Sequence, residues 1–145
     1  MPNCCDIWEV FEENKNLIKE YKYWKLVIRK NHTKLGSCVA ITKRHMERFS
    51  DVTADEIGEF AILVKEVENS LKAVFNYDKI NYLMLMMKDK HAHFHIMPRY
   101  DSHRNFAGIE WVDEGGPDPL VQVKEFVGQE TLNKIKDEIE NNIAI

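Results

Sequence analysis

Three histidines occupy alternate positions in the stretch HAHFHIMPRY, residues 91–100, of a chain that holds six histidines in all. Successive side chains of a β-strand point to opposite faces of a sheet, so His91, His93 and His95 would share one face and the apolar residues between them the other. A strand of this kind needs a packed core on one side only. The alternation therefore predicts a two-sided strand with a candidate site on its histidine face.

The neighbouring segments predict that this strand belongs to an antiparallel sheet. The nearly all-apolar run at 80–87 is typical of a buried strand, and the KDK that follows it predicts a tight turn, so 80–87 and 91–99 should pair antiparallel. Upstream, an apolar segment at 21–30, turn residues at 31–37 and a second apolar segment at 38–42 predict a hairpin.

Two helices are predicted from side-chain periodicity. Thr53 and Glu56 have the spacing of a capping box, and apolar residues recur at helical spacing from there to about Asn76. This apolar stripe consists of Ile57, Phe60, Ala61, Val64, Val67, Leu71 and Val74. A more polar helix is predicted over 130–142, and the region 101–119 before it is predicted to be a loop.

We expect the chain to form one domain over residues 1–145, because no repeat and no Pro/Gly/Ser-rich linker divides it. The expected parts are a lead-in at 1–20, a motif core at 20–106, and a C-terminal loop and helix at 107–145.

Composition narrows the class of protein. A formal net charge of -4 with 30% charged residues is typical of an ordinary soluble domain and argues against binding to extended nucleic acid. The longest apolar run, Tyr82–Met87, is too short to span a bilayer, and the first residues lack the order of a signal peptide. Cys4, Cys5 and Cys38 cannot all pair with one another, so reduced thiols are expected. We therefore expect a cytoplasmic protein with no membrane partner.

The histidine strand has three interpretations. The first is a partly solvated strand face without chemistry. The second is a metal site, because imidazoles at alternate strand positions can converge on one ion. The third is nucleophilic catalysis on phosphorus, in which the neutral imidazole of His93 attacks while its two neighbours stabilise the anionic transition state. The third interpretation suits the alternation best, because it gives the central ring a neighbour on each side.

The sequence HAHFHIM resembles the His-φ-His-φ-His-φ-φ signature of the histidine triad (HIT) superfamily of nucleotide hydrolases and transferases. The resemblance extends back through GSCVAITKRHMERFSDVTADE and covers roughly residues 20–106. It implies an α+β fold with a meandering antiparallel sheet of about five strands, one long packed helix and a C-terminal helix. It also implies a homodimer that binds a small-molecule nucleotide.

The same resemblance implies a role for each catalytic residue. His93 would be the nucleophile that takes the α-phosphate as a nucleotidyl-histidine, His95 would hydrogen-bond the phosphoryl or bridging oxygen, and His91 would fix the ring of His93. Transferases of the galactose-1-phosphate type resemble His-Pro-His-x-Gln at this site, so His95 favours hydrolysis, with transfer as a possible further activity. The substrate would be a dinucleoside polyphosphate or a nucleoside phosphoramidate-type conjugate. No cofactor is expected, apart from magnesium accompanying a polyphosphate.

The chain departs from the family pattern at three places. Before the triad, where members often supply Asn, Gln or Ser near the phosphate or leaving group, it has Met86, Met87 and the short turn 88–90. Ser37 follows Gly36 where many members carry a fourth active-site histidine, so Ser37 is predicted to contact phosphate through its hydroxyl. Arg29 stands where members place an acidic or amide residue on the ribose, so it is predicted in the nucleoside-binding part of the site. His45 is expected beyond the far end of its strand, as a partly exposed turn histidine and not as a replacement for the missing one.

Further cations near the site predict phosphate contacts from Lys90 and Arg99. Trp111 is expected either in a base pocket or in the core. Two alternatives to an active hydrolase remain open. One is a nucleotide-binding regulatory module with little turnover, which Ser37, Arg29 and the missing polar loop before the triad favour and the intact His93 disfavours. The other is a His-ligated metal protein.

Overall fold

A computed structural model describes residues 6–32, 34–86, 90–113 and 127–143 of the chain. Five strands form one antiparallel sheet in the order β1-β2-β3-β5-β4. Their bounds are β1 Leu17–Glu20, β2 Trp24–Ile28, β3 Cys38–Thr42, β4 Lys79–Leu83 and β5 His93–Arg99. The α+β fold expected from the sequence is confirmed, including the antiparallel sheet of five strands, the long helix and the C-terminal helix. The strands do not follow one another as in a simple meander, because β5 lies between β3 and β4.

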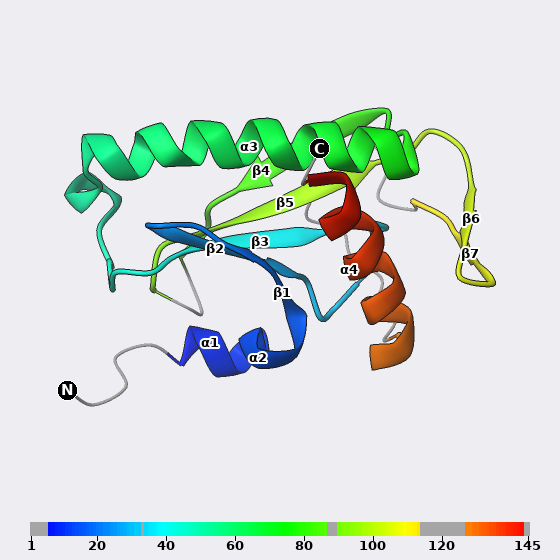
Figure 1. Ribbon diagram of the computed structural model, residues 1–145, viewed down its shortest axis with the longest axis horizontal. Coiled ribbons are helices and arrows are strands. Elements are labelled where there is room, and N and C mark those ends of the chain that lie inside the picture. Colours follow the sequence, from blue (N-terminus) through cyan, green and yellow to red (C-terminus); the bar gives the residue numbers. More distant parts are fainter. Residues whose placement is uncertain (1–5, 33, 87–89, 114–126, 144–145) are drawn as a thin grey trace.

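Helices cover both faces of this sheet. Figure 1 shows the long helix α3 along one side and the two short helices α1 and α2 on the opposite side. The helices are α1 Ile7–Val10, α2 Glu13–Asn16, α3 Ala54–Phe75 and α4 Gln129–Ile143, with a single 3₁₀ turn, η1, at Phe49–Asp51. The sheet therefore has a thick core on the α3 and α4 side and a thinner apolar layer on the other.

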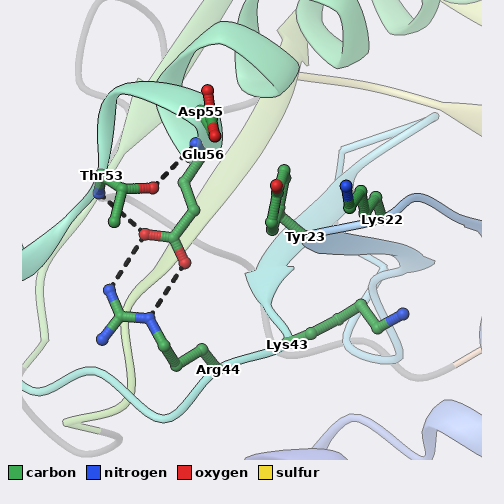
Figure 2. A pocket seen from close by; sticks show the side chains of 7 residues that line it. All are labelled: Lys22, Tyr23, Lys43, Arg44, Thr53, Asp55 and Glu56. Carbon is green, nitrogen blue, oxygen red and sulfur yellow. Dashed lines mark hydrogen bonds and ion pairs between the residues drawn. The ribbon is translucent and has the colours of Figure 1, made fainter.

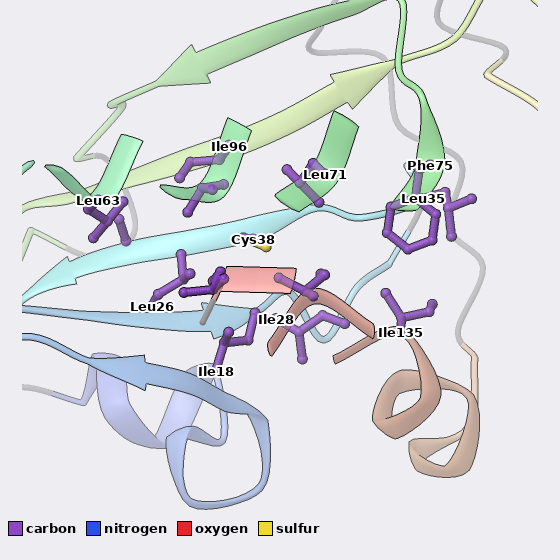
Figure 3. Packing of buried hydrophobic residues seen from close by; sticks show 14 of the residues in the cluster. Ile18, Leu26, Ile28, Leu35, Cys38, Leu63, Leu71, Phe75, Ile96 and Ile135 are labelled. Carbon is purple, nitrogen blue, oxygen red and sulfur yellow. The ribbon is translucent and has the colours of Figure 1, made fainter. Parts of the chain in front are cut away.

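The main core lies between the sheet and the pair α3 and α4. Figure 3 shows Leu63, Leu71 and Phe75 of α3 and Ile135 of α4 packed over Leu26, Ile28, Cys38 and Ile96 of the sheet. Ile96 alternates with the histidines of β5, so the apolar face predicted for this strand does lie in the core. The second, smaller cluster on the opposite face contains Ile7, Phe11, Val27, Val39 and Ile41.

The capping box predicted at the start of α3 is confirmed. The Glu56 backbone N–H donates to the Thr53 hydroxyl at 3.1 Å, and the Thr53 backbone N–H donates to the Glu56 carboxylate at 2.8 Å. Asn76 ends the helix in the left-handed conformation with φ 50°. The predicted apolar stripe is too wide, because Ile57 and Ala61 are exposed. At about 100° of rotation per residue they lie about 120° and about 160° around the helix from Leu63.

Other boundaries differ from those expected. The strand predicted over 80–87 ends at Leu83, and the strand predicted over 91–99 begins at His93. The predicted turn at 88–90 lies mostly outside the described residues. The region predicted as a loop contains a separate hairpin of β6 Arg104–Phe106 and β7 Ile109–Trp111.

The sheet fixes where the histidine strand lies. β5 is an interior strand, with β3 on one side and β4 on the other. Its pairing with β3 places His93 opposite Ile41 and His95 opposite Val39. Cys38 is a free buried thiol, whereas Cys4 and Cys5 lie outside the described residues. In the part of the chain that the structure describes, no helix has both the length and the apolar character that a bilayer span requires.

Candidate functional site

The histidine face of the sheet is covered by aromatic side chains from α1 and from the residue that follows it. The ring of Phe11 lies 5.9 Å from that of His93 and 6.0 Å from that of His95, measured between centroids. The ring of Trp8 packs edge-on to His91 at 5.7 Å. His91 is only 3% exposed and His93 only 4%. The triad therefore lies in a largely dry environment, where hydrogen bonds and charges act strongly.

His93 is held in one tautomer by the backbone of His91. Its Nδ1 lies 2.7 Å from the carbonyl oxygen of His91. A carbonyl oxygen can only accept, so Nδ1 of His93 carries the hydrogen. In the neutral ring the other nitrogen, Nε2, then keeps its lone pair. An unprotonated Nε2 is the state that nucleophilic attack requires.

His95 lies beside His93, with ring centroids 5.0 Å apart. Burial, together with the nearby positive charges of Arg29 and of a protonated His93, lowers the pKa of His95 to about 3. The ring is therefore neutral at physiological pH. Among the residues that the structure describes, its buried Nδ1 has no hydrogen-bond partner. A buried polar atom in this state calls for an explanation, and a bound ligand is one.

A cavity of about 310 Å³ opens next to this face, lined by Val10, Phe11, Arg29, Lys30 and Asn31. Phe11 connects it to the triad, because the same ring contacts His93 and His95. Arg29 is largely buried and donates to the Asn31 carbonyl oxygen at 3.1 Å. The cavity volume lies within the range of small-molecule sites, and its lining combines an aromatic ring with a guanidinium.

Ser37 directly precedes β3, two residues before Val39, which pairs with His95. The Ser37 side chain is fully buried, and its hydroxyl donates to the Lys34 carbonyl oxygen at 2.6 Å. That bond uses its only hydrogen, so towards a phosphate Ser37 could act only as an acceptor. Its predicted phosphate contact stays a prediction.

The other two predicted phosphate ligands lie away from the rings of His93 and His95. Lys90 is exposed just before His91. Arg99 is at the far end of β5, about 13 Å along the strand from His95. There it donates to both carboxylate oxygens of Asp113, at 2.7 and 3.2 Å, and Lys34 lies 2.9 Å from the same carboxylate. Burial alone would raise the pKa of Asp113, but these two cations keep it well below its usual value.

Two histidines that sequence reasoning did not place in the site are tied to it. His45 does lie beyond the end of β3 and is partly exposed, as expected, but its Nδ1 is 3.2 Å from Nδ1 of His91. The antiparallel pairing of Ile41 with His93 could have revealed this, because it brings the residues after β3 next to the residues before β5.

His32 is the second. Its Nδ1 donates to the Arg29 carbonyl oxygen at 3.1 Å, while its Nε2 accepts from the Gly36 N–H at 2.8 Å. It is 1% exposed, and burial lowers its pKa to about 4. It therefore fixes the turn that carries Arg29 and Ser37. The ring of Trp111 lies 5.5 Å from that of His32. Trp111 belongs to the core, so of the two positions expected for it the core is the one observed.

A second cavity, of about 400 Å³, lies at the start of α3 (Figure 2). Two of its cations are engaged in ion pairs: Arg44 binds Glu56 at 3.0 and 3.2 Å, and Lys43 binds Glu20 at 2.6 Å. Among the described residues, no group of three or more His, Cys, Asp or Glu side chains is arranged to hold a metal ion. In the triad itself, Nδ1 of His93 and Nε2 of His91 are bonded to backbone carbonyls.

Comparison with known proteins decides the family. A model of the HIT domain family matches residues 11–102. The chain belongs to the HIT family. Within this family of nucleotide-binding proteins and hydrolases, an uncharacterized HIT-like protein of Methanocaldococcus jannaschii is 33% identical over 70 residues, which are 46% of this chain and 54% of that protein. The match thus spans about half the length of that curated relative.

Solved HIT structures share the fold. A hypothetical histidine triad nucleotide-binding protein from Sulfolobus tokodaii is 20% identical, with a TM-score of 0.68 over 89% of this chain and 83% of that one. The Plasmodium falciparum diadenosine triphosphate hydrolase, solved in complex with cyclomarin A, is 14% identical, with a TM-score of 0.65 over 90% of this chain and 77% of that one. At these identities the likeness establishes the fold alone.

Proposed function

We propose that this HIT protein hydrolyses a nucleotide conjugate at its α-phosphate through a nucleotidyl-histidine on His93. The observation that carries the proposal is the bond from His93 Nδ1 to the His91 carbonyl, because it leaves Nε2 as the nitrogen with a lone pair. The membership of the chain in the HIT family supports the same chemistry.

The reaction would proceed in two displacements. In the first, Nε2 of His93 forms a bond to the α-phosphorus while the bond from phosphorus to the leaving group breaks. In the second, water attacks the phosphorus, the P–N bond breaks and the mononucleotide leaves. His95 carries one ring hydrogen when neutral, so it can donate to a phosphoryl or bridging oxygen in both steps. His91 acts through its backbone and positions His93.

The proposed substrate class is a dinucleoside polyphosphate or a nucleoside phosphoramidate-type conjugate. The cavity beside the triad supports it, since Phe11 offers a ring face for a base and Arg29 a cation for the ribose–phosphate part. The relative from P. falciparum is a diadenosine triphosphate hydrolase, which favours the polyphosphate members of the class. No cofactor is proposed beyond magnesium bound to a polyphosphate substrate, so assays should be run with and without it.

A nucleotide-binding module with little turnover is the second candidate. The observation that favours it is the burial of His93, which is only 4% exposed beneath the ring of Phe11. A nucleophile covered in this way reaches phosphorus only if the substrate displaces the covering side chain.

The deciding experiment compares wild-type protein, His93→Ala and His103→Ala on a panel of adenine and guanine dinucleoside polyphosphates and phosphoramidates. His103 is a matched control, because it is an exposed histidine on another part of the fold. We expect mononucleotide release and an acid-labile adduct with wild type and His103→Ala, and neither with His93→Ala. Turnover that survives His93→Ala refutes the mechanism. Nucleotide binding without turnover in all three proteins establishes the binding module.

We also propose a homodimer, with the cytosol as its location. Among the described strands β4 is an edge of the sheet, and α3 is linked to β4 by the bond from Tyr82 to Glu68. Ile57, 41% exposed, lies about 20° around α3 from Glu68 and so on the same side of the helix. A sheet edge and an exposed apolar side chain on one side of the fold are suited to contact with a second copy. Sedimentation equilibrium of wild type and Ile57→Asp tests this, since a charge at a dimer contact shifts the equilibrium towards monomer.

A further inference from the structure

Two imidazoles face one another where the segment after β3 meets the residues before β5. Nδ1 of His45 lies 3.2 Å from Nδ1 of His91. On its other side, His45 places Nε2 2.7 Å from the Glu47 carboxylate, and His91 places Nε2 2.6 Å from the Thr42 carbonyl oxygen. The two rings therefore link a surface carboxylate to a backbone carbonyl in one continuous hydrogen-bonded chain.

The two ends of this chain fix how many protons it holds. A carboxylate and a carbonyl oxygen only accept, so Nε2 of His45 and Nε2 of His91 each carry a hydrogen. The Thr42 hydroxyl also lies 3.0 Å from Nε2 of His91, but the Thr42 carbonyl is closer, at 2.6 Å, so the hydroxyl is a second acceptor for this N–H. A neutral imidazole has one ring hydrogen, so two neutral rings would point bare lone pairs at each other across 3.2 Å. The contact is a hydrogen bond only when one more proton lies between the Nδ1 atoms. The pair then carries one positive charge.

His45 is the ring that holds this charge. The side chain of His45 is 30% exposed and lies against the Glu47 carboxylate, whereas His91 is 3% exposed. Burial lowers the pKa of His91, and charge on His45 or His93 lowers it further, against the opposing effects of the Thr42 carbonyl and Glu47. Trp8, the other described ring packed on His91, is uncharged.

The segment that carries His45 also holds the peptide between His91 and His93. The Ala92 N–H donates to the Met46 carbonyl at 2.7 Å, and the Thr42 hydroxyl donates to the Ala92 carbonyl at 3.2 Å. Arg44 ties the segment to α3 through Glu56, as Figure 2 shows. The ring of His45 is thus fixed to the same framework as the carbonyl that selects the tautomer of His93.

We propose that His45 is a positioning residue for the triad: as an imidazolium bound to Glu47, it donates Nδ1–H to Nδ1 of His91 and fixes that residue, whose carbonyl holds Nδ1–H of His93. The effect on catalysis rests on the proposed function. The protonation of the pair formed by His45 and His91 does not rest on the proposed function, because it follows from contacts that exist without substrate.

The first test is nitrogen-15 NMR of the histidine rings at neutral pH, which reads protonation directly and needs no activity. We expect both nitrogens of His45 to carry hydrogens, His91 to be protonated at Nε2 alone, and His93 to show a slowly exchanging Nδ1–H. Two neutral rings at His45 and His91 in the wild-type protein would overturn the proposal.

The second test asks whether His91 is fixed by a hydrogen-bond donor at position 45 or by a positive charge there. His45→Asn places an amide N–H near the original Nδ1 and so keeps a donor to His91, whereas His45→Leu keeps volume without a donor. His103→Asn is the matched control, since His103 also contacts a carboxylate, Glu110, at 3.1 Å. We expect rapid exchange of the His93 Nδ1–H in His45→Leu and slow exchange in His45→Asn and the control. Equal exchange in all three variants would refute the positioning role.

If turnover is found, the variants should rank by kcat as they rank by exchange of the His93 Nδ1–H. His45→Leu should lower kcat by about ten-fold to a hundred-fold with little change in KM, because a misplaced nucleophile affects the transition state more than binding. His45→Asn should retain most of kcat, because its amide keeps a donor to His91. If no conjugate is turned over, the exchange of the His93 proton still decides the proposal.

Discussion

Acidification should destabilise the fold through His32, the buried histidine that fixes the turn carrying Arg29 and Ser37. Its ring is neutral in the native state, with Nε2 accepting from the Gly36 N–H at 2.8 Å. A proton on Nε2 would turn that acceptor into a donor facing a donor, in a site that is 1% exposed. The folded protein therefore resists protonation of His32, while the unfolded chain does not.

The magnitude follows from the two pKa values. Burial lowers the pKa of His32 from 6.5 to about 4. Between these values the unfolded chain binds more protons than the folded protein, so stability is fully present above pH 6.5 and is lost as the pH falls towards 4. Integrating this difference in bound protons over pH gives the cost: relative to pH 7, the free energy of unfolding falls by about 2 kcal/mol at pH 5 and by about 3 kcal/mol at pH 4.

Urea unfolding of wild type and His32→Gln at pH 7, 5 and 4 measures the effect. Glutamine does not titrate, and its amide oxygen can still accept from Gly36. His95 and Asp113, whose folded pKa values are also lowered, destabilise both proteins alike and cancel in the comparison. Between pH 7 and pH 4 the free energy of unfolding of the wild type should fall by about 3 kcal/mol more than that of His32→Gln. The exposed control His103→Gln should follow the wild type. Parallel pH profiles for wild type and His32→Gln would show that His32 is not held neutral by the fold.

Three further outcomes are expected. Leu71→Ala, in the core between α3 and the sheet, should lower the free energy of unfolding by about 2–5 kcal/mol in chemical denaturation, whereas exposed Ile62→Ala should change it by less than about 0.5 kcal/mol. Thr53→Ala, which removes the hydroxyl of the capping box, should cost about 1 kcal/mol in the same assay, and an equal stability would show that the box contributes nothing. Phe11→Ala should weaken binding of a nucleotide conjugate by about ten-fold in calorimetry, or about 1.4 kcal/mol; unchanged affinity would place the base elsewhere.

The sequence predicted those parts of the fold whose patterns are local. Strand β5 followed from a period of two, the start of α3 from its capping box, and the hairpin of β2 and β3 from apolar segments around turn residues. The hairpin of β6 and β7 was missed because its two-residue turn is Ala107–Gly108, with φ 55° and 74°, and not the Asn-Gly pair that signals such a turn. β1 has only four residues, two of them charged, and shows no clear alternation.

The candidate site was predictable to the extent that it lies within one strand. The triad and the identity of the central histidine come from residues 91–95. The contacts of His45 and Phe11 with the triad depend on how distant segments pack, and no residue-level pattern at 45 or 11 indicates them. Arg99 shows the converse: a cation near the motif in sequence is paired with Asp113 at the far end of the strand.

The distribution of charge over the histidines suits a site that binds an anion and then moves a proton. His95 is neutral because burial, together with the charges of Arg29 and of a protonated His93, lowers its pKa to about 3. An anionic phosphoryl group beside His95 would raise this pKa, because a nearby negative charge favours the protonated ring. His95 therefore gains affinity for a proton only when the substrate is in place.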